Sequence, residues 1–193
     1  MQLSLYNTLS RQQEPVFPED QQRLRFYCCG PTVYGPAHIG NFRTFVVQDG
    51  FRRLVEFLGI QTCHVRNITD VDDKTIRASI QAGMSLGRFT KKWQDRFELD
   101  CAELNLLAPQ YAPSAVGHIS EQIELIENLI AQGYAYVGAN NSVYYRIASF
   151  ADYGKLTNRN LEEMQAGARI DVEDAKENPM DFVLWKSAKE DEV

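Results

Sequence analysis

Apolar positions along the chain follow the two-residue period of strands in some segments and the three- and four-residue steps of helices in others. Leu3–Leu9 alternates like a strand, and the polar connector after it, with Pro15 and Pro18, is expected to form a loop. Leu24–Cys29 is short and mostly apolar, as in a strand covered on both faces. Gly30–Ala37 contains two glycines and two prolines, which predicts a shaped loop.

A helix of about five turns is predicted after this loop. Its apolar residues recur at helical steps from Phe42 to Leu58, and Gly59 lies where a helix end is expected. Gln61–Asn67 then has the pattern of a second strand. A strand, a helix and a strand in this order are long enough for a crossover connection, so residues 24–67 predict a pair of parallel strands.

Most of the remaining chain is predicted to be helical, with a hairpin toward its end. Apolar periodicity predicts helices that end at Gly83, near Leu104 and at Gly133. The middle helix carries one apolar face, formed by Phe89, Trp93, Phe97, Cys101 and Leu104. A hairpin is predicted around Asn140-Asn141, and a weaker strand pattern covers Asp181–Lys186.

Composition adds that the chain is an ordinary globular sequence. It has 193 residues, 44% of them hydrophobic, and a net charge of −6, which excludes disordered, collagen-like and disulfide-scaffold classes. Four cysteines without a CxxC pair, and no leader-like pattern at the N-terminus, favour a reduced, cytoplasmic chain without a membrane segment. The densest cationic cluster is expected to be a solvated helix face and comprises Arg88, Lys91, Lys92 and Arg96.

The sharpest chemical signal is His38-Ile39-Gly40-Asn41, where the glycine- and proline-rich loop opens a helix. A helix start offers unpaired N–H groups and partial positive charge, so it favours an anion such as a phosphate. Gly40 would let backbone and phosphate approach closely, and His38 and Asn41 could donate hydrogen bonds to phosphate oxygens. For an isolated motif, the simpler alternative is that His38 caps the helix and Gly40 is a spacer.

A more specific pattern is found in five longer segments: Leu5–Leu9, Tyr27–Asn41, Val65–Lys74, Gln165–Arg169 and Asn178–Lys186. Together they closely resemble the N-terminal part of bacterial cysteinyl-tRNA synthetases. His38 to Asn41 is similar to the first signature of class I aminoacyl-tRNA synthetases, whose last position is commonly histidine; asparagine keeps a donor but loses the titratable ring. The resemblance implies an α/β, Rossmann-like catalytic domain with a parallel sheet, its N-terminal half in residues 1–110, and part of a connective insertion in 111–193.

The resemblance also implies activation of cysteine by ATP with Mg²⁺, followed by transfer to tRNA(Cys). The residues that it implies for ATP are Thr32, His38, Gly40 and Asn41, with His38 and Asn41 in catalytic roles. Those that it implies for the amino acid are Cys29, Gly30 and Thr69. Cys29 also matches the family's Zn²⁺ ligand, and an open position on zinc could take the substrate thiolate. Without the resemblance, Cys29 and its neighbour Cys28 are more simply small buried hydrophobes.

The second class I signature, Lys-Met-Ser-Lys-Ser, does not occur in this sequence, and the family's other zinc ligands and tRNA-reading domain are expected beyond Val193. We therefore expect no aminoacylation by this chain alone. Two alternatives stay open: a cysteine ligase that acts on an amino sugar, and a non-catalytic nucleotide-binding or interaction module. Asp72-Asp73-Lys74 and Phe182–Lys186 favour the tRNA enzyme over the amino-sugar ligase.

The other candidate residues are expected to be structural. Acidic residues are favoured at a helix start, so helix capping and local ion pairing are preferred over a cation site for Asp70, Asp72 and Asp73. Two lone histidines in apolar patterns, His64 and His118, are expected to be hydrogen-bonded structural residues. Cys63 and Cys101 are expected in the core.

Overall fold

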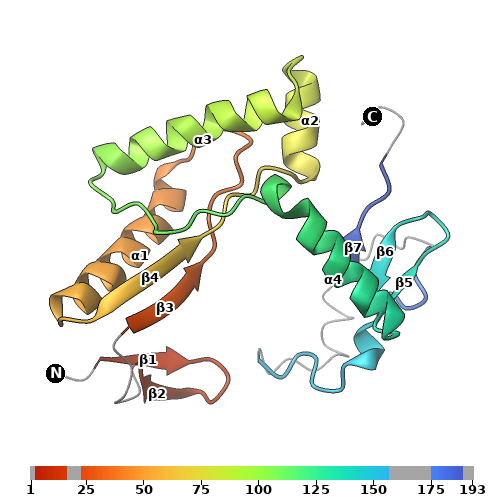
Figure 1. The fold of residues 1–193 in the computed structure, drawn as a ribbon, viewed down its shortest axis with the longest axis horizontal. Helices are drawn as coiled ribbons and strands as arrows, with labels where there is room; N and C mark the ends of the chain where they lie inside the picture. The colour runs from red at the N-terminus through yellow and green to blue at the C-terminus, as the bar shows by residue number, and fades with distance from the viewer. Residues whose placement is uncertain (1–2, 17–22, 157–174, 189–193) are drawn as a thin grey trace. The chain divides into compact units, whose positions relative to one another are not determined.

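The computed structural model describes residues 3–16, 23–156 and 175–188 (Figure 1). The chain divides into two compact units, one within residues 17–119 and the other formed by 3–16 and 120–193. The elements of the first unit are β3 (Arg23–Cys28), α1 (Ile39–Phe57), β4 (Gln61–Arg66), α2 (Asp73–Gln81), α3 (Leu86–Glu103) and the 3₁₀ turn η1 (Val116–His118). Within the described ranges, none of the helices is long and apolar enough to cross a membrane.

The first unit is built on the predicted strand, helix and strand. β3 and β4 pair in parallel, in a register that runs from Arg23 opposite Gln61 to Cys28 opposite Arg66 (Figure 1). α1 connects them and ends before Gly59, whose φ of +81° is a conformation that glycine adopts without strain. The predicted parallel pair and its helical crossover are therefore confirmed.

Aromatic side chains of α1 and α3 form the core of this unit. Phe42 and Phe45 of α1 pack against Phe97 of α3, with ring centroids 5.8 Å and 4.9 Å from that of Phe97, and Cys101 completes the cluster. The predicted apolar face of α3 is buried at Phe89, Phe97 and Cys101. The last position assigned to that face, Leu104, lies at the end of the helix and is 45% exposed.

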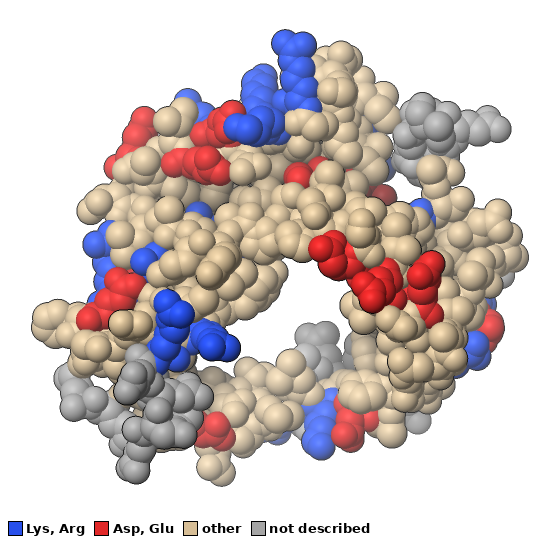
Figure 2. Space-filling model, viewed as in Figure 1, with Lys and Arg blue, Asp and Glu red and all other residues tan. Residues whose placement is uncertain are grey.

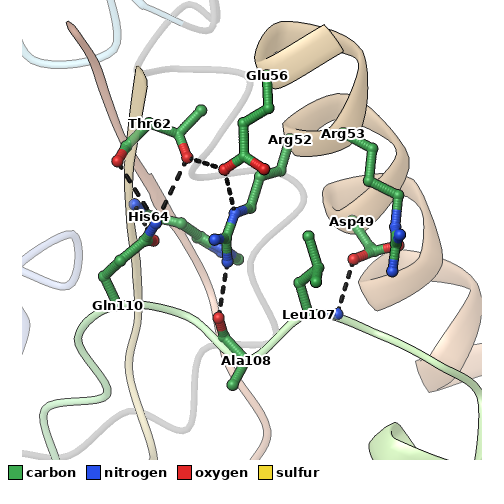
Figure 3. Close-up of polar contacts among 9 residues, drawn as sticks. All are labelled: Asp49, Arg52, Arg53, Glu56, Thr62, His64, Leu107, Ala108 and Gln110. Carbon is green, nitrogen blue, oxygen red and sulfur yellow. Dashed lines mark hydrogen bonds and ion pairs between the residues drawn. The ribbon is translucent and has the colours of Figure 1, made fainter. Parts of the chain in front are cut away.

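The segment after α3 runs beside β4 and is tied to α1 (Figure 3). Asp49 accepts a hydrogen bond from the N–H of Leu107 at 2.8 Å, and Arg52 donates to the carbonyl of Ala108 at 2.7 Å. The side chain of Gln110 accepts from the N–H of His64 at 2.8 Å. Tyr111 forms a parallel β-bridge with Val65, and Ser114 forms one with Ile68. The segment after α3 therefore adds a third, irregular extended segment beside the parallel strand pair.

The exposed face of α3 carries charges of both signs. Lys91 pairs with Asp95 and Arg96 with Asp100, and blue and red side chains lie next to each other over this helix in Figure 2. All four cationic residues noted in the sequence are exposed. The prediction of a solvated face is therefore confirmed.

The described residues of the second unit form two antiparallel arrangements and one α-helix. Its elements are β1 (Ser4–Asn7), β2 (Gln12–Pro15), α4 (Ile119–Ala131), β5 (Ala135–Val137), β6 (Val143–Tyr145), the 3₁₀ turn η2 (Ile147–Ser149) and β7 (Phe182–Trp185). The β5–β6 hairpin turns through Asn141, whose φ is +60°, and β7 pairs with β6. The predicted hairpin and the weaker strand are both confirmed.

One loop prediction is wrong. Gln12–Pro15 forms β2 and pairs antiparallel with β1, after a turn in which Arg11 has a φ of +59°. The residues of β2 are mostly exposed, so hydrogen bonds to β1 rather than a buried face define this strand. Pro18, the other residue of the expected loop, lies outside the described residues.

Buried hydrogen bonds join the strands of the second unit to the segment before β7. Asp181 is 2% exposed, and its carboxylate accepts from the hydroxyl of Tyr136 at 2.8 Å and from the N–H of Ile147 at 3.0 Å. The hydroxyl of Tyr136 in turn accepts from the N–H of Glu177 at 2.8 Å. Burial and the bond to Asp181 raise the pKa of Tyr136, which keeps its hydroxyl a donor.

Candidate functional site

A pocket of about 350 Å³ lies in the first unit, at the carboxyl end of β3. Ten consecutive residues, 29–38, form much of its wall, and the other lining residues are Asn41, Thr44 and Phe45 of α1, Lys74 of α2, and Trp93 and Phe97 of α3. The end of a parallel strand and the start of the following helix is where α/β proteins commonly bind ligands. Of the residues implied for ATP and cysteine, Cys29, Gly30, Thr32, His38 and Asn41 line this pocket.

His38 and Asn41 form a reciprocal cap at the start of α1. Nδ1 of His38 accepts from the N–H of Gly40 at 3.1 Å, and Oδ1 of Asn41 accepts from the N–H of His38 at 3.0 Å. Because Nδ1 accepts, the proton of a neutral imidazole lies on Nε2, which is then a donor. The amide nitrogen of Asn41 is also a donor. Capping and ligand binding are therefore compatible roles for these side chains.

Gly40 has a local steric role in this cap. It is not among the lining residues, and a Cβ added to it would lie 2.9 Å from Cε1 and 3.0 Å from Nδ1 of His38. The missing side chain therefore makes room for the imidazole ring.

Gly30 and Thr69 are joined through Asn67, a residue that sequence reasoning did not identify. Oδ1 of Asn67 accepts from the N–H of Gly30 at 2.9 Å and from the hydroxyl of Tyr27 at 2.8 Å, and its Nδ2 donates to Thr69 at 3.2 Å. A Cβ on Gly30 would lie 1.6 Å from the carbonyl oxygen of Asn67, so no larger residue fits without a backbone shift. The only sequence signal for this contact was the glycine itself.

Thr69 supports the pocket wall without lining it. Its N–H donates to the carbonyl of Pro31 at 3.0 Å, and its own carbonyl accepts from the N–H of Val33 at 3.1 Å. These two bonds hold the loop around Thr32 in a fixed position beside the residues that follow β4.

Cys29 presents a thiol to the pocket, whereas Cys28 is half-buried. Cys29 is exposed, and burial raises the pKa of the Cys28 thiol. The simpler expectation of a buried side chain is therefore wrong for Cys29. Within the described parts of the chain, no group of three or more His, Cys, Asp or Glu residues is placed to hold a metal ion. The described residues thus place one thiol at this pocket and do not complete a zinc coordination shell.

The acidic residues before α2 have structural contacts. Asp72 caps α2 by accepting from the N–H groups of Lys74 and Thr75 at 3.0 Å and 2.8 Å, which confirms the predicted capping. Asp70 accepts from the N–H of Val116 at 2.9 Å.

The two lone histidines differ from each other. Nδ1 of His118 lies 2.9 Å from the carbonyl oxygen of Ser114, as expected of a hydrogen-bonded residue. His64 is 2% exposed, and neither of its ring nitrogens has a hydrogen-bond partner among the described residues, so that part of the prediction is wrong. It is nevertheless structural, because its ring stacks on Phe26 with centroids 4.6 Å apart.

The expected core placement of the other cysteines is confirmed for Cys101, which is buried, while Cys63 is partly buried.

Comparisons with solved structures identify the fold. The leucyl-tRNA synthetase of Agrobacterium radiobacter K84, solved in a ternary complex, aligns with a TM-score of 0.58 and 16% identity over 70% of this chain and 23% of that one. The methionyl-tRNA synthetase of Mycobacterium tuberculosis, solved with methionyl-adenylate, aligns with a TM-score of 0.52 and 17% identity over 58% of this chain and 23% of that one. The fold is therefore that of the catalytic domain of class I aminoacyl-tRNA synthetases.

Sequence comparisons narrow the class to one family. Residues 15–193 match the family model of the class I (C) tRNA synthetase catalytic domain, and the chain belongs to this family. Relatives named cysteine–tRNA ligase are 46% identical in Opitutus terrae, 44% in Methylococcus capsulatus and 47% in Francisella tularensis. The matches cover 97–100% of this chain and 40–44% of the relatives, so the chain spans less than half their length.

Proposed function

We propose that this chain is part of a cysteine–tRNA ligase and that its pocket binds ATP and cysteine. The observation that carries the proposal is the cap of α1. By accepting through Nδ1, His38 is left with an Nε2–H donor at a helix start that lines the pocket. The family membership and the names of the relatives support the choice of cysteine and of tRNA(Cys).

The proposed reaction has two steps. In the first, the carboxylate of cysteine attacks the α-phosphorus of ATP, supplied with Mg²⁺, and pyrophosphate leaves. His38 and Asn41 donate to phosphate oxygens whose negative charge grows during the displacement, and the N-terminus of α1 favours the same charge. In the second step, the ribose hydroxyl at the acceptor end of tRNA(Cys) takes the cysteinyl group and releases AMP.

Gly30, Thr32 and Thr69 are proposed to shape the amino-acid and nucleotide positions. Gly30 and Thr32 belong to the pocket wall, and Thr69 holds that wall through backbone hydrogen bonds. We propose further that residues 1–110 belong to the catalytic domain and 111–193 to a connective insertion, and that the enzyme acts in the cytoplasm.

Cys29 is proposed as one ligand of a zinc ion. Zinc prefers thiolate and imidazole ligands, and a thiol substrate binds it better than a hydroxyl does. The described residues place this thiol at the pocket, and no group of three or more His, Cys, Asp or Glu residues among them is arranged to hold a metal ion. No step of the reaction proposed above depends on zinc.

Cysteine-dependent exchange between ATP and pyrophosphate tests this function in the complete ligase. His38→Ser keeps a side-chain oxygen that can cap α1 but removes the imidazole donor, so exchange should fall by about 100-fold or more while the helix stays capped. His118→Gln is the matched control, because it removes a histidine that does not line the pocket. Unchanged exchange in His38→Ser would refute the role of His38, and transfer of cysteine to an amino sugar but not to tRNA would refute the proposed acceptor.

A further inference from the structure

Lys74 lines the same pocket, and the proposed reaction assigns it no role. Lys74 is the second residue of α2, and the cap that Asp72 provides fixes its backbone. Its Nζ lies 5.4 Å from the centre of the Tyr34 ring, which also belongs to the pocket wall. None of the ion pairs among the described residues involves this ammonium group.

The ring of Trp93 of α3 belongs to the pocket wall and packs edge-on against Phe89, with centroids 6.3 Å apart. Its Nε1 is inaccessible to solvent and has no hydrogen-bond partner among the described residues, so this N–H group is not exposed to the pocket.

The lining of the pocket contains the cationic residue Lys74 and neither aspartate nor glutamate. Behind the wall, the guanidinium of Arg66 lies 5.3 Å from the ring centres of both Phe45 and Phe97, two lining residues. Arg66 is only 6% exposed, and its Nε has no partner among the described residues. These fixed groups favour an anionic ligand.

We propose that Lys74 binds an oxyanion of the ligand, in addition to the donors at the start of α1. Its ammonium group supplies positive charge and hydrogen-bond donors, as in other recognition of phosphates and carboxylates. The oxyanion is a phosphate of the nucleotide or the carboxylate of the amino acid. The inference rests on the proposed function, because it assigns further ligand contacts to the same pocket.

Calorimetric titration of this chain with three probes, ATP, inorganic pyrophosphate and cysteine, tests the assignment. Lys74→Met should weaken binding of the anion concerned by at least about tenfold. Lys91→Met is the matched control, because it removes a lysine from the exposed face of α3. Weaker binding of ATP and pyrophosphate assigns the site to phosphate, and weaker binding of cysteine alone assigns it to the carboxylate.

Two negative results have different meanings. If the unmodified chain binds none of the three probes, the proposed function of the pocket fails, and this inference fails with it. If the unmodified chain binds ATP or cysteine and Lys74→Met binds them equally well, the oxyanion site is overturned and the proposed function remains. Equal effects of Lys74→Met and Lys91→Met also overturn the inference, because they would show only a loss of overall charge.

Discussion

Replacing His64 by phenylalanine should change how the stability of the first unit depends on pH. His64 is 2% exposed and stacks on Phe26, and neither ring nitrogen has a partner among the described residues. Burial, together with the nearby charges of Arg66 and Arg52, lowers the pKa of His64 from 6.5 to about 4. The native state therefore holds this ring neutral at pH values where an unfolded chain would protonate it.

The direction of the effect follows from which state binds the proton. Between pH 6.5 and about pH 4 the unfolded chain binds a proton at residue 64 and the folded chain does not, so the free energy of unfolding decreases as the pH falls through this range. The loss reaches about 3 kcal/mol at ~1.4 kcal/mol per pH unit and grows no further once the folded state is also protonated. Above pH 6.5 this contribution is fully present.

His64→Phe removes the titrating group and keeps a ring that can stack on Phe26. Because no hydrogen bond to the imidazole is lost, the variant should be as stable as the parent at pH 7 or more stable by about 1–2 kcal/mol. Its stability should also change less between pH 6.5 and pH 4.

Urea unfolding at several pH values measures both effects. The fluorescence of Trp93 in a Trp185→Phe background reports on the first unit, since Trp185 belongs to the second. His118→Gln controls for the removal of an exposed imidazole. Parallel curves of stability against pH for the parent and His64→Phe would refute the reasoning.

Three further substitutions test local contacts. Gly30→Ala places a Cβ 1.6 Å from a backbone oxygen and should destabilise the first unit by more than about 2 kcal/mol in urea unfolding, whereas Gly35→Ala, with no atom within 4 Å, should be neutral. Asp181→Ala leaves two buried donors without an acceptor and should cost about 2–4 kcal/mol, measured by Trp185 fluorescence; a loss below 0.5 kcal/mol would contradict it. Gly40→Ala should weaken ATP binding in calorimetry through displacement of His38, while the melting temperature stays nearly unchanged.

The two helices that build the aromatic core, α1 and α3, were predictable from the sequence, whereas β2 was not. α1 and α3 repeat phenylalanines at helical steps because each buries one face in the aromatic core. β2 was missed because it is mostly exposed, so hydrophobic alternation cannot indicate it. The turn at Arg11, which allows β2 to fold back, requires a positive φ at a residue that gives no such signal.

The burial of side chains on the inner face of β4 is a second feature that the hydrophobic pattern does not predict. Thr62, His64 and Arg66 alternate as strand residues do, yet these polar positions are the buried ones. The sequence identifies such a strand, but its pattern does not indicate that the polar side chains are the buried ones. Tertiary contacts account for their burial: Gln110 approaches Thr62 and the backbone of His64, and two phenylalanines flank the guanidinium of Arg66.

The start of α1 was the part of the site that local chemistry could indicate, because every group in it lies within four residues. His38, Gly40 and Asn41 contact one another through the cap, so their types and spacing already contain the geometry. Asn67 and Trp93 carry no such local signal. Asn67 reaches Gly30 across 37 residues of sequence, and Trp93 lines the pocket only because α3 packs on α1. The motif from His38 to Asn41 therefore locates one wall of this pocket, whereas the residues of the other walls are brought together only by the fold.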